Sequence, residues 1–185
     1  MKMRQGFVSN SSSSSFIIMG NEQQPIAPKH KISPYEKSLT IPDDLGGETQ
    51  FGWQVQKYST FEDRLNWAAL GATYKAIKRE AGRYSDYYYK RLKPNKKWLN
   101  MLIKVLKKDF CLTHVDIRFN DDNMNDVGYI DHQSGPADRP ENFEFFKNED
   151  SLRQWLYASG SQILCGNDND DVYWNIKGEL KKNED

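Results

Sequence analysis

Residues 112–134 read LTHVDIRFNDDNMNDVGYIDHQS and contain two runs in which apolar and polar side chains alternate. In the first run, Val115, Ile117 and Phe119 alternate with polar residues, which is the period of two typical of a half-buried strand. The second run, 127–132, follows a segment rich in Asn and Asp, residue types that favour turns. Two such runs joined by a polar turn predict an antiparallel β-hairpin.

The second run ends in a cluster of polar residues just before Gly135-Pro136, which must break the strand. An imidazole near a carboxylate can act as a base for a hydroxyl nucleophile, so Asp131, His132 and Ser134 are candidate catalytic residues. Adjacent strand residues point to opposite faces, so His132 and Ser134 share a face and their acid has to come from elsewhere, either Asp168 or Asp170. The alternative is that the histidine and serine satisfy backbone groups of the loop.

Charge is distributed unevenly along the chain, although its 26 basic and 26 acidic residues cancel. Residues 73–108 hold twelve Lys or Arg and two acids, a net charge of +10. Residues 109–185 hold seven basic and seventeen acidic residues, a net charge of −10. This asymmetry indicates a basic surface that can meet an anion. The alternative is that the two halves neutralise each other across the fold.

The basic region is predicted to be helical and is a candidate binding site for an anion or a nucleic acid. Its Lys and Arg residues can neutralise phosphates, and neighbouring tyrosines can stack on bases. No helix-turn-helix, zinc-finger or aromatic-sheet signature accompanies it, and the alternative is a solvated helix face with tyrosines in the core. The candidate residues are Lys75, Lys78, Arg79, Arg83, Lys90, Arg91, Lys93, Lys96 and Lys97.

Strands and helices are interspersed, which predicts an α+β fold with a mainly antiparallel sheet packed against two or three helices. Helices are expected from Thr60, a capping residue, to about Ala81, then over 84–92 and 95–109, and after a cap at Asn148 or Asp150. The helix over 95–109 is expected to be amphipathic, with an apolar face of Trp98, Met101, Leu102, Val105 and Leu106 and a solvated side of Lys96, Lys97, Lys104, Lys107 and Lys108. Strands are expected at 38–42, 50–58, 142–146, 161–165 and 172–176, and a charged tail, 179–185, is expected to fray.

The N-terminal 37 residues are predicted to form a Ser-rich arm and linker, and residues 38–185 a single globular domain. Five consecutive serines, Ser11 to Ser15, lie between apolar segments, and three prolines follow before residue 38. The arm is expected to lie over the domain with Phe7, Phe16, Ile17 and Ile18 buried and the serines exposed. The serines could also grip an anion, with a structural arm as the alternative.

The sequence gives little support for a Cys-x-x-Cys site, a histidine metal site or a calcium site. Cys111 and Cys165 form no Cys-x-x-Cys motif and indicate a reducing compartment, and the three histidines lack paired metal-ligand spacing. Two Asn/Asp-rich loops, 120–126 and 167–171, lack the Gly and Glu positions of a helix–loop–helix calcium site. No cofactor or metal is expected.

No apolar run approaches the roughly 20 residues of a membrane span, so a soluble intracellular protein without a membrane partner is expected.

The string Gly6-Phe7-Val8-Ser9-Asn10-Ser11-Ser12-Ser13-Ser14-Ser15-Phe16 resembles an N-terminal motif of uncharacterised proteins from large tailed bacteriophages and some bacteria. Phe51-Gly52-Trp53, 129–134 and 163–169 look like further blocks of one such phage family. The resemblance implies a phage-encoded product in the bacterial host cytoplasm or the virion, and it carries no activity with it.

The incomplete catalytic motif, the charge asymmetry and the abundant aromatics favour a non-enzymatic binding module for a host or phage macromolecule, either protein or nucleic acid. The alternative is a small hydrolase or nuclease that uses His132 and Ser134.

Overall fold

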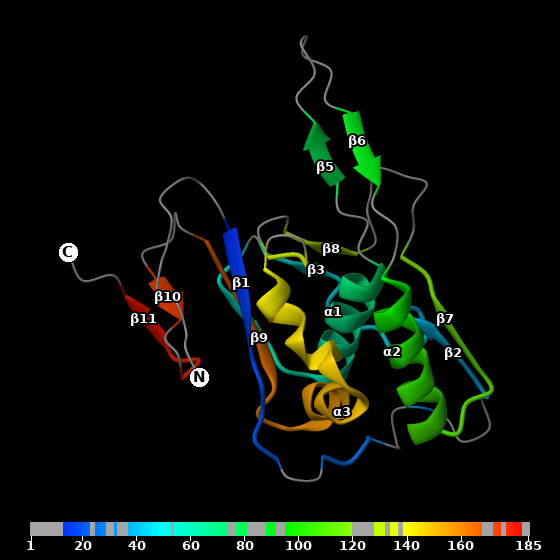
Figure 1. The fold of residues 1–185 in the computed structure, drawn as a ribbon. Helices are drawn as coiled ribbons and strands as arrows, with labels where there is room; N and C mark the ends of the chain where they lie inside the picture. The colour runs from blue at the N-terminus through cyan, green and yellow to red at the C-terminus, as the bar shows by residue number, and fades with distance from the viewer. Residues whose placement is uncertain are drawn as a thin grey trace.

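The computed structural model describes residues 13–22, 25–28, 32, 37–52, 54–73, 77–80, 88–91, 95–119, 128–131, 134–136, 139–167, 172–174 and 177–182. These residues form an α+β fold in which helices α1 (Phe61–Thr73), α2 (Lys96–Asp109) and α3 (Glu149–Tyr157) pack together beside short sheets (Figure 1). The predicted fold class is confirmed. None of the helices among the described residues is both long and apolar enough to cross a membrane.

Helix α1 is the centre of the fold, because every residue from Phe61 to Ala72 is buried. Its start is fixed by a reciprocal cap, which confirms Thr60 as the predicted capping residue. The Asp63 N–H donates to Thr60 Oγ1 (3.2 Å), and the Thr60 N–H donates to Asp63 Oδ2 (3.3 Å). This arrangement satisfies two amides that the first helical turn leaves without helical partners.

A helix buried on all sides needs partners for its polar side chains. The Arg64 guanidinium donates to the carbonyl oxygens of Ala158 and Ser161, beyond the end of α3. The Asn66 amide donates to the carbonyl oxygens of Gly46 and Glu48, both at 2.9 Å. Loops on two sides of α1 are therefore tied to it by hydrogen bonds as well as by apolar packing.

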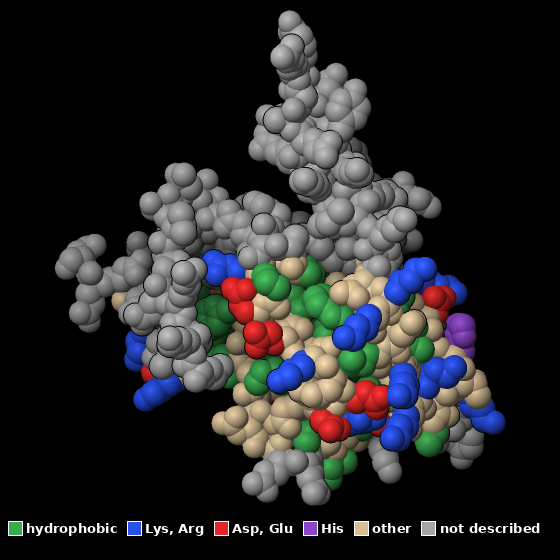
Figure 2. Space-filling view, viewed as in Figure 1, with side chains coloured by type: hydrophobic (Ala, Val, Ile, Leu, Met, Phe, Trp, Pro, Cys, Tyr) green, Lys and Arg blue, Asp and Glu red, His purple; other side chains and the backbone are tan. Residues whose placement is uncertain are grey.

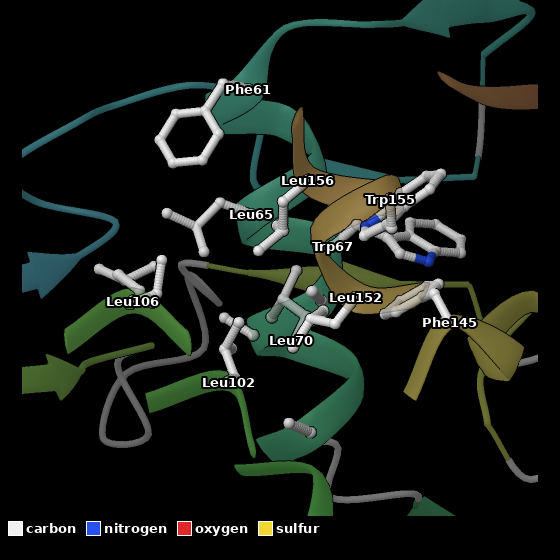
Figure 3. Packing of buried hydrophobic residues seen from close by; sticks show 14 of the residues in the cluster. Phe61, Leu65, Trp67, Leu70, Leu102, Leu106, Phe145, Leu152, Trp155 and Leu156 are labelled. Carbon is white, nitrogen blue, oxygen red and sulfur yellow. The ribbon is translucent and has the colours of Figure 1, made fainter. Parts of the chain in front are cut away.

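The hydrophobic core lies where α1, α2 and α3 meet. Figure 3 shows leucines of the three helices converging there, among them Leu65, Leu102, Leu152 and Leu156, all without solvent exposure. A long 3-10 helix, η2 (Pro140–Lys147), adds Phe143, Phe145 and Phe146. The sequence prediction of a strand at 142–146 is wrong, because consecutive Phe145 and Phe146 are both buried and no in-out alternation exists.

The largest sheet is antiparallel and has the order β1 (Ser13–Ile18), β9 (Gln162–Asn167), β4 (Gln56–Tyr58). Two short ladders are parallel: β2 (Ser38–Ile41) with β7 (His114–Ile117), and β3 (Gln50–Phe51) with β8 (Tyr129–Ile130). The predicted hairpin of residues 112–134 is therefore wrong. The alternation of apolar and polar residues correctly identified β7 and β8 as strands. They do not pair with each other, because each pairs with a strand that lies between residues 38 and 51.

Residues 77–80 and 88–91 do not continue the helices that the sequence predicted. Helix α1 ends at Thr73, and β5 (Ile77–Glu80) pairs antiparallel with β6 (Tyr88–Arg91). Figure 1 shows this pair of strands standing away from the helices and the other sheets. The tyrosines at positions 88 and 89 favour a strand, and Gly82 between the two strands disfavours a helix.

The two chain ends also differ from expectation. Ser15 is buried, whereas Phe16, Ile17 and Ile18 are only partly buried, so the predicted pattern is reversed for these residues; Phe7 lies outside the described part of the chain. Residues Leu180–Lys182 form strand β11 and pair with β10 (Val172–Trp174), so the tail predicted to fray holds a strand.

Candidate functional site

Ser134 belongs to a buried group of polar residues that joins β1 to the rest of the molecule. Its side chain has no solvent exposure, and its Oγ accepts a hydrogen bond from the Ser15 N–H at 2.7 Å. The Asn142 amide donates to the carbonyl oxygens of Ser15 (2.8 Å) and Ser134 (3.2 Å). Ser134 therefore satisfies a backbone group of a segment 119 residues away in sequence.

Cys165 completes this group, which we call the arm junction (Ser15, Ser134, Asn142 and Cys165). The Ser15 hydroxyl donates to Cys165 Sγ at 3.1 Å. Burial raises the pKa of the Cys165 thiol to about 12, so the sulfur remains a protonated thiol near neutral pH. The junction can hold the N-terminal strand, but its thiol is not a nucleophile.

The other candidate catalytic residues are described only in part. Asp131 has no solvent exposure, its N–H donates to the Phe51 carbonyl, and its carbonyl accepts from the Ser134 N–H at 2.8 Å. Asp131 and Ser134 are thus joined by a hydrogen bond between their backbones. His132, Asp168 and Asp170 lie outside the described residues.

Four of the candidate basic residues occupy the paired strands β5 and β6. The register sets Lys78 opposite Lys90 and Ile77 opposite Arg91, and Arg79 is opposite Tyr89. Lys75, Arg83 and Lys93 lie outside the described residues. These four basic residues therefore lie on a two-stranded ribbon and not on the helix face that the sequence predicted, whereas Lys96 and Lys97 lie in a helix as predicted.

Helix α2 continues this basic region after residue 91. The Asn95 side chain caps the helix by accepting from the Trp98 N–H at 3.3 Å. Its exposed lysines are Lys96, Lys97, Lys104, Lys107 and Lys108, as the amphipathic pattern predicted. Figure 2 shows Lys and Arg side chains gathered on the face that α2 forms. Only Lys104 is partly neutralised among the described contacts of these lysines, by Glu149 at 2.5 Å.

A hollow of about 450 Å³ opens beside the first turn of α2. It is lined by Lys97, Trp98, Pro140, Phe143, Glu144, Phe146 and Lys147. The sequence assigned Trp98 to the apolar face of α2 and missed Lys147, because only the folded 3-10 helix η2 brings residues 140–147 to this place.

Within the described ranges, no group of three or more His, Cys, Asp or Glu side chains is placed to hold a metal ion. Comparison with protein-family models, with curated proteins and with solved structures gives no match to this chain. Function is therefore inferred from the geometry and chemistry of the chain itself.

Proposed function

We propose that the chain is a non-enzymatic binding module that holds nucleic acid through the β5–β6 ribbon and the adjoining lysines of α2. The observation that carries this proposal is the placement of Lys78, Arg79, Lys90 and Arg91 on two paired strands that stand away from the body (Figure 1). A ribbon held in this way can reach a ligand without displacing any part of the core.

The chemistry of the ribbon matches a polyanion. Nucleic acid carries one phosphate charge for each nucleotide, and each Lys or Arg that neutralises a phosphate releases a condensed counterion. A two-stranded β-ribbon also has dimensions that the major groove of a duplex admits. The net charge of +10 over residues 73–108 supports binding of this kind.

The buried state of Ser134 favours binding over the hydrolase alternative. A nucleophile has to contact the substrate, and the Ser134 hydroxyl has no exposed surface and already accepts a hydrogen bond from Ser15.

The resemblance of the N-terminal string to phage proteins suggests the biological context in which the proposed binding takes place. The chain then acts as a phage accessory protein in the bacterial cytoplasm during infection, or within the virion. A pull-down from infected cells, with and without nuclease, tests this setting, and we expect nuclease to release the retained material.

The direct test measures binding of the purified full chain to labelled DNA of about 20 nucleotides, single-stranded and duplex, by fluorescence anisotropy over a salt series. The variant K78E/K90E reverses the charge at two positions that are paired across the ribbon. We expect it to weaken binding by about tenfold or more, because each lost phosphate contact removes a counterion-release contribution.

The control variant K181E/K182E makes the same charge change on exposed residues of β11, on the side of the body away from the ribbon (Figure 1). We expect it to bind within about twofold of the parent. Absence of binding to either DNA at low salt, or equal losses in the two variants, would refute the proposal.

A further inference from the structure

The exposed face of α2 is basic along its whole length. Within the helix, every fully exposed residue other than Asn100 is a lysine, and we call this set the lysine face: Lys96, Lys97, Lys104, Lys107 and Lys108. At 3.6 residues per turn these positions fall within an arc of about 120°, and at 1.5 Å per residue they extend over about 18 Å. Figure 2 shows Lys and Arg side chains gathered over this helix. The lysine face is therefore a continuous strip and not a cluster at one end.

The acids beside the lysine face leave most of its charge uncompensated. Asp109, the one acid of α2, is largely buried and accepts hydrogen bonds from Arg153 Nε (2.8 Å) and Nη2 (3.0 Å). Glu149 of α3 contacts Lys104 at 2.5 Å, and this contact holds the pKa of Glu149 below its ordinary value, with smaller effects of Arg153 and Lys108. The other four lysines of the face form no ion pair with any residue that the structure describes.

The end of α2 carries the basic surface onto the neighbouring strands. The Leu112 N–H donates to the Lys107 carbonyl at 2.9 Å, and Cys111 between them has a φ of 57°. This left-handed residue turns the chain out of the helix, so that β7 begins at His114. The Lys37 carbonyl then accepts hydrogen bonds from the Thr113 N–H (2.7 Å) and the His114 N–H (3.0 Å). Lys37 and His114 are both exposed, so they extend the lysine face beyond its last turn.

The lysine face and the ribbon adjoin end to end. Strand β6 ends at Arg91 and α2 begins at Lys96, so the chain between them spans at most about 18 Å. Figure 1 shows the ribbon beyond the first turn of α2, with the helix running away from it. At about 3.4 Å per base pair, the 18 Å of the lysine face correspond to about five base pairs. The four paired residues of the ribbon, at about 3.3 Å each, add about four more.

We propose that nucleic acid held by the ribbon lies along the whole lysine face, and that Lys107, Lys108, Lys37 and His114 contact its phosphates at the far end. This inference rests on the proposed function and gives it a footprint of roughly ten nucleotides or base pairs. Each lysine ammonium pairs with a phosphate, and the His114 imidazole can donate an N–H to a phosphate oxygen. Contacts of this kind fix the position of the ligand and read no bases, so binding is independent of sequence.

The test neutralises the far end of the face in the variant K107Q/K108Q. Gln has nearly the helix propensity of Lys, so α2 is retained. The ligand is whichever DNA of about 20 nucleotides, single-stranded or duplex, binds the parent chain more tightly. We expect affinity at low salt to fall by about tenfold, and the slope of log K against log salt to become shallower by about 1.4 for a single strand or about 1.8 for a duplex.

The control K181Q/K182Q makes the same change on exposed residues of β11 and should keep both the affinity, within about twofold, and the slope. Lysines in the last turn of a helix also offset its dipole. If that were the only role of Lys107 and Lys108, K107Q/K108Q would change stability and leave DNA binding as in the parent.

The variants separate this inference from the proposed function. If the parent chain binds neither DNA at low salt, the proposed function fails. If the parent binds and K78E/K90E weakens binding, while K107Q/K108Q has the affinity and slope of the parent, only the extended footprint is overturned.

A second measurement uses the unaltered chain and does not depend on folding of a variant. Lysines are acetylated with and without the DNA, and the extent of modification at each lysine is measured by mass spectrometry. We expect DNA to protect Lys37, Lys107 and Lys108 and to leave Lys181 and Lys182 as reactive as before. Protection confined to the lysines of the ribbon, or equal protection of every exposed lysine, would overturn the proposal.

Discussion

The Ser134 hydroxyl is buried and accepts a hydrogen bond from a backbone amide that is distant in the sequence. The Ser15 N–H donates to it at 2.7 Å, and Asn142 bonds the carbonyl oxygens of both serines. Burial makes each of these bonds important, because an unpaired donor in the interior retains the full cost of its lost hydration. The arm junction is therefore a polar contact between the N-terminal strand and the domain that is costly to break.

Ser134→Ala is expected to lower the free energy of unfolding by about 1–3 kcal/mol, because the Ser15 N–H loses its acceptor and stays buried. Urea denaturation followed by circular dichroism measures the change. Ser159→Ala, at an exposed serine, is the control and should change stability by less than about 0.5 kcal/mol. Equal stability of Ser134→Ala and the parent protein would show that water or another group replaces the hydroxyl.

Cys165 is expected to make the fold less stable at alkaline pH. Burial raises its pKa from 9.0 to about 12, so between these values the unfolded chain releases a proton that the folded chain keeps. The folded state then binds more protons than the unfolded state, and stability falls with rising pH, by up to about 1.4 kcal/mol for each pH unit. Urea midpoints at about pH 8 and about pH 10 should show this decline.

Cys165→Ala should reduce the alkaline decline, since it removes the titrating thiol. Cys111→Ala, which removes the exposed cysteine, is the matched control and should leave the decline in place. A decline of the same size in Cys165→Ala would assign the effect to other groups.

At the level of elements, η2 can approach α1 closely because α1 has a glycine at position 71. A β-carbon built there would lie 2.2 Å from Phe143 Cε1 and 2.5 Å from Phe143 Cδ1. The Phe143 ring cannot easily move aside, because it is stacked between Trp67 and Trp98. Gly71 thus sets the distance between the central helix and the stacked rings of Trp67, Phe143 and Trp98.

Gly71→Ala is expected to destabilise the protein by about 1–3 kcal/mol through overpacking. Helix propensity alone would predict the opposite effect, a gain in stability of about 1 kcal/mol. Thermal and urea unfolding show whether the substitution lowers or raises the free energy of unfolding. In a Phe143→Leu background the same substitution should cost less, because the smaller side chain leaves room for the new methyl group. An equal cost in both backgrounds would show that the contact with Phe143 is not the cause.

At the scale of the whole molecule, β1 is an edge strand that pairs with β9 over six residues. Strand β9 also pairs with β4 and contributes Ile163, Leu164 and Cys165 to the interior. Removing β1 would expose one edge of β9 and open the arm junction at the same time. The N-terminal strand therefore belongs to the structural unit formed by the domain.

Deletion of residues 1–20 is expected to lower the free energy of unfolding by at least about 2 kcal/mol, because it breaks the β1–β9 ladder and leaves buried groups of the junction unpaired. Denaturant unfolding of the truncated chain measures the loss. A synthetic peptide of residues 1–20 should restore stability when it is added in excess. Unchanged stability after deletion would show that the domain holds without the arm.

The sequence by itself determined the features that depend on local chemistry. The Thr60 cap, the cap at Asn148 (one of the two positions predicted, with Asp150) and the amphipathic pattern of α2 appear in the structure as predicted. Each depends on residues within about one helical turn, where spacing fixes which groups meet. The α+β class followed from the same local signals, since both periodicities occur along the chain.

Tertiary structure alone decided which segments meet. Alternation marked Val115 and Ile130 as strand residues, but their ladders form with β2 and β3 and not with each other, because period two specifies a face and not a partner. Ser15 is buried because Ser134, Asn142 and Cys165 supply partners from distant parts of the chain. Composition cannot reveal such partners. The hollow at Trp98 likewise exists only because the fold packs η2 against α2, which no local pattern encodes.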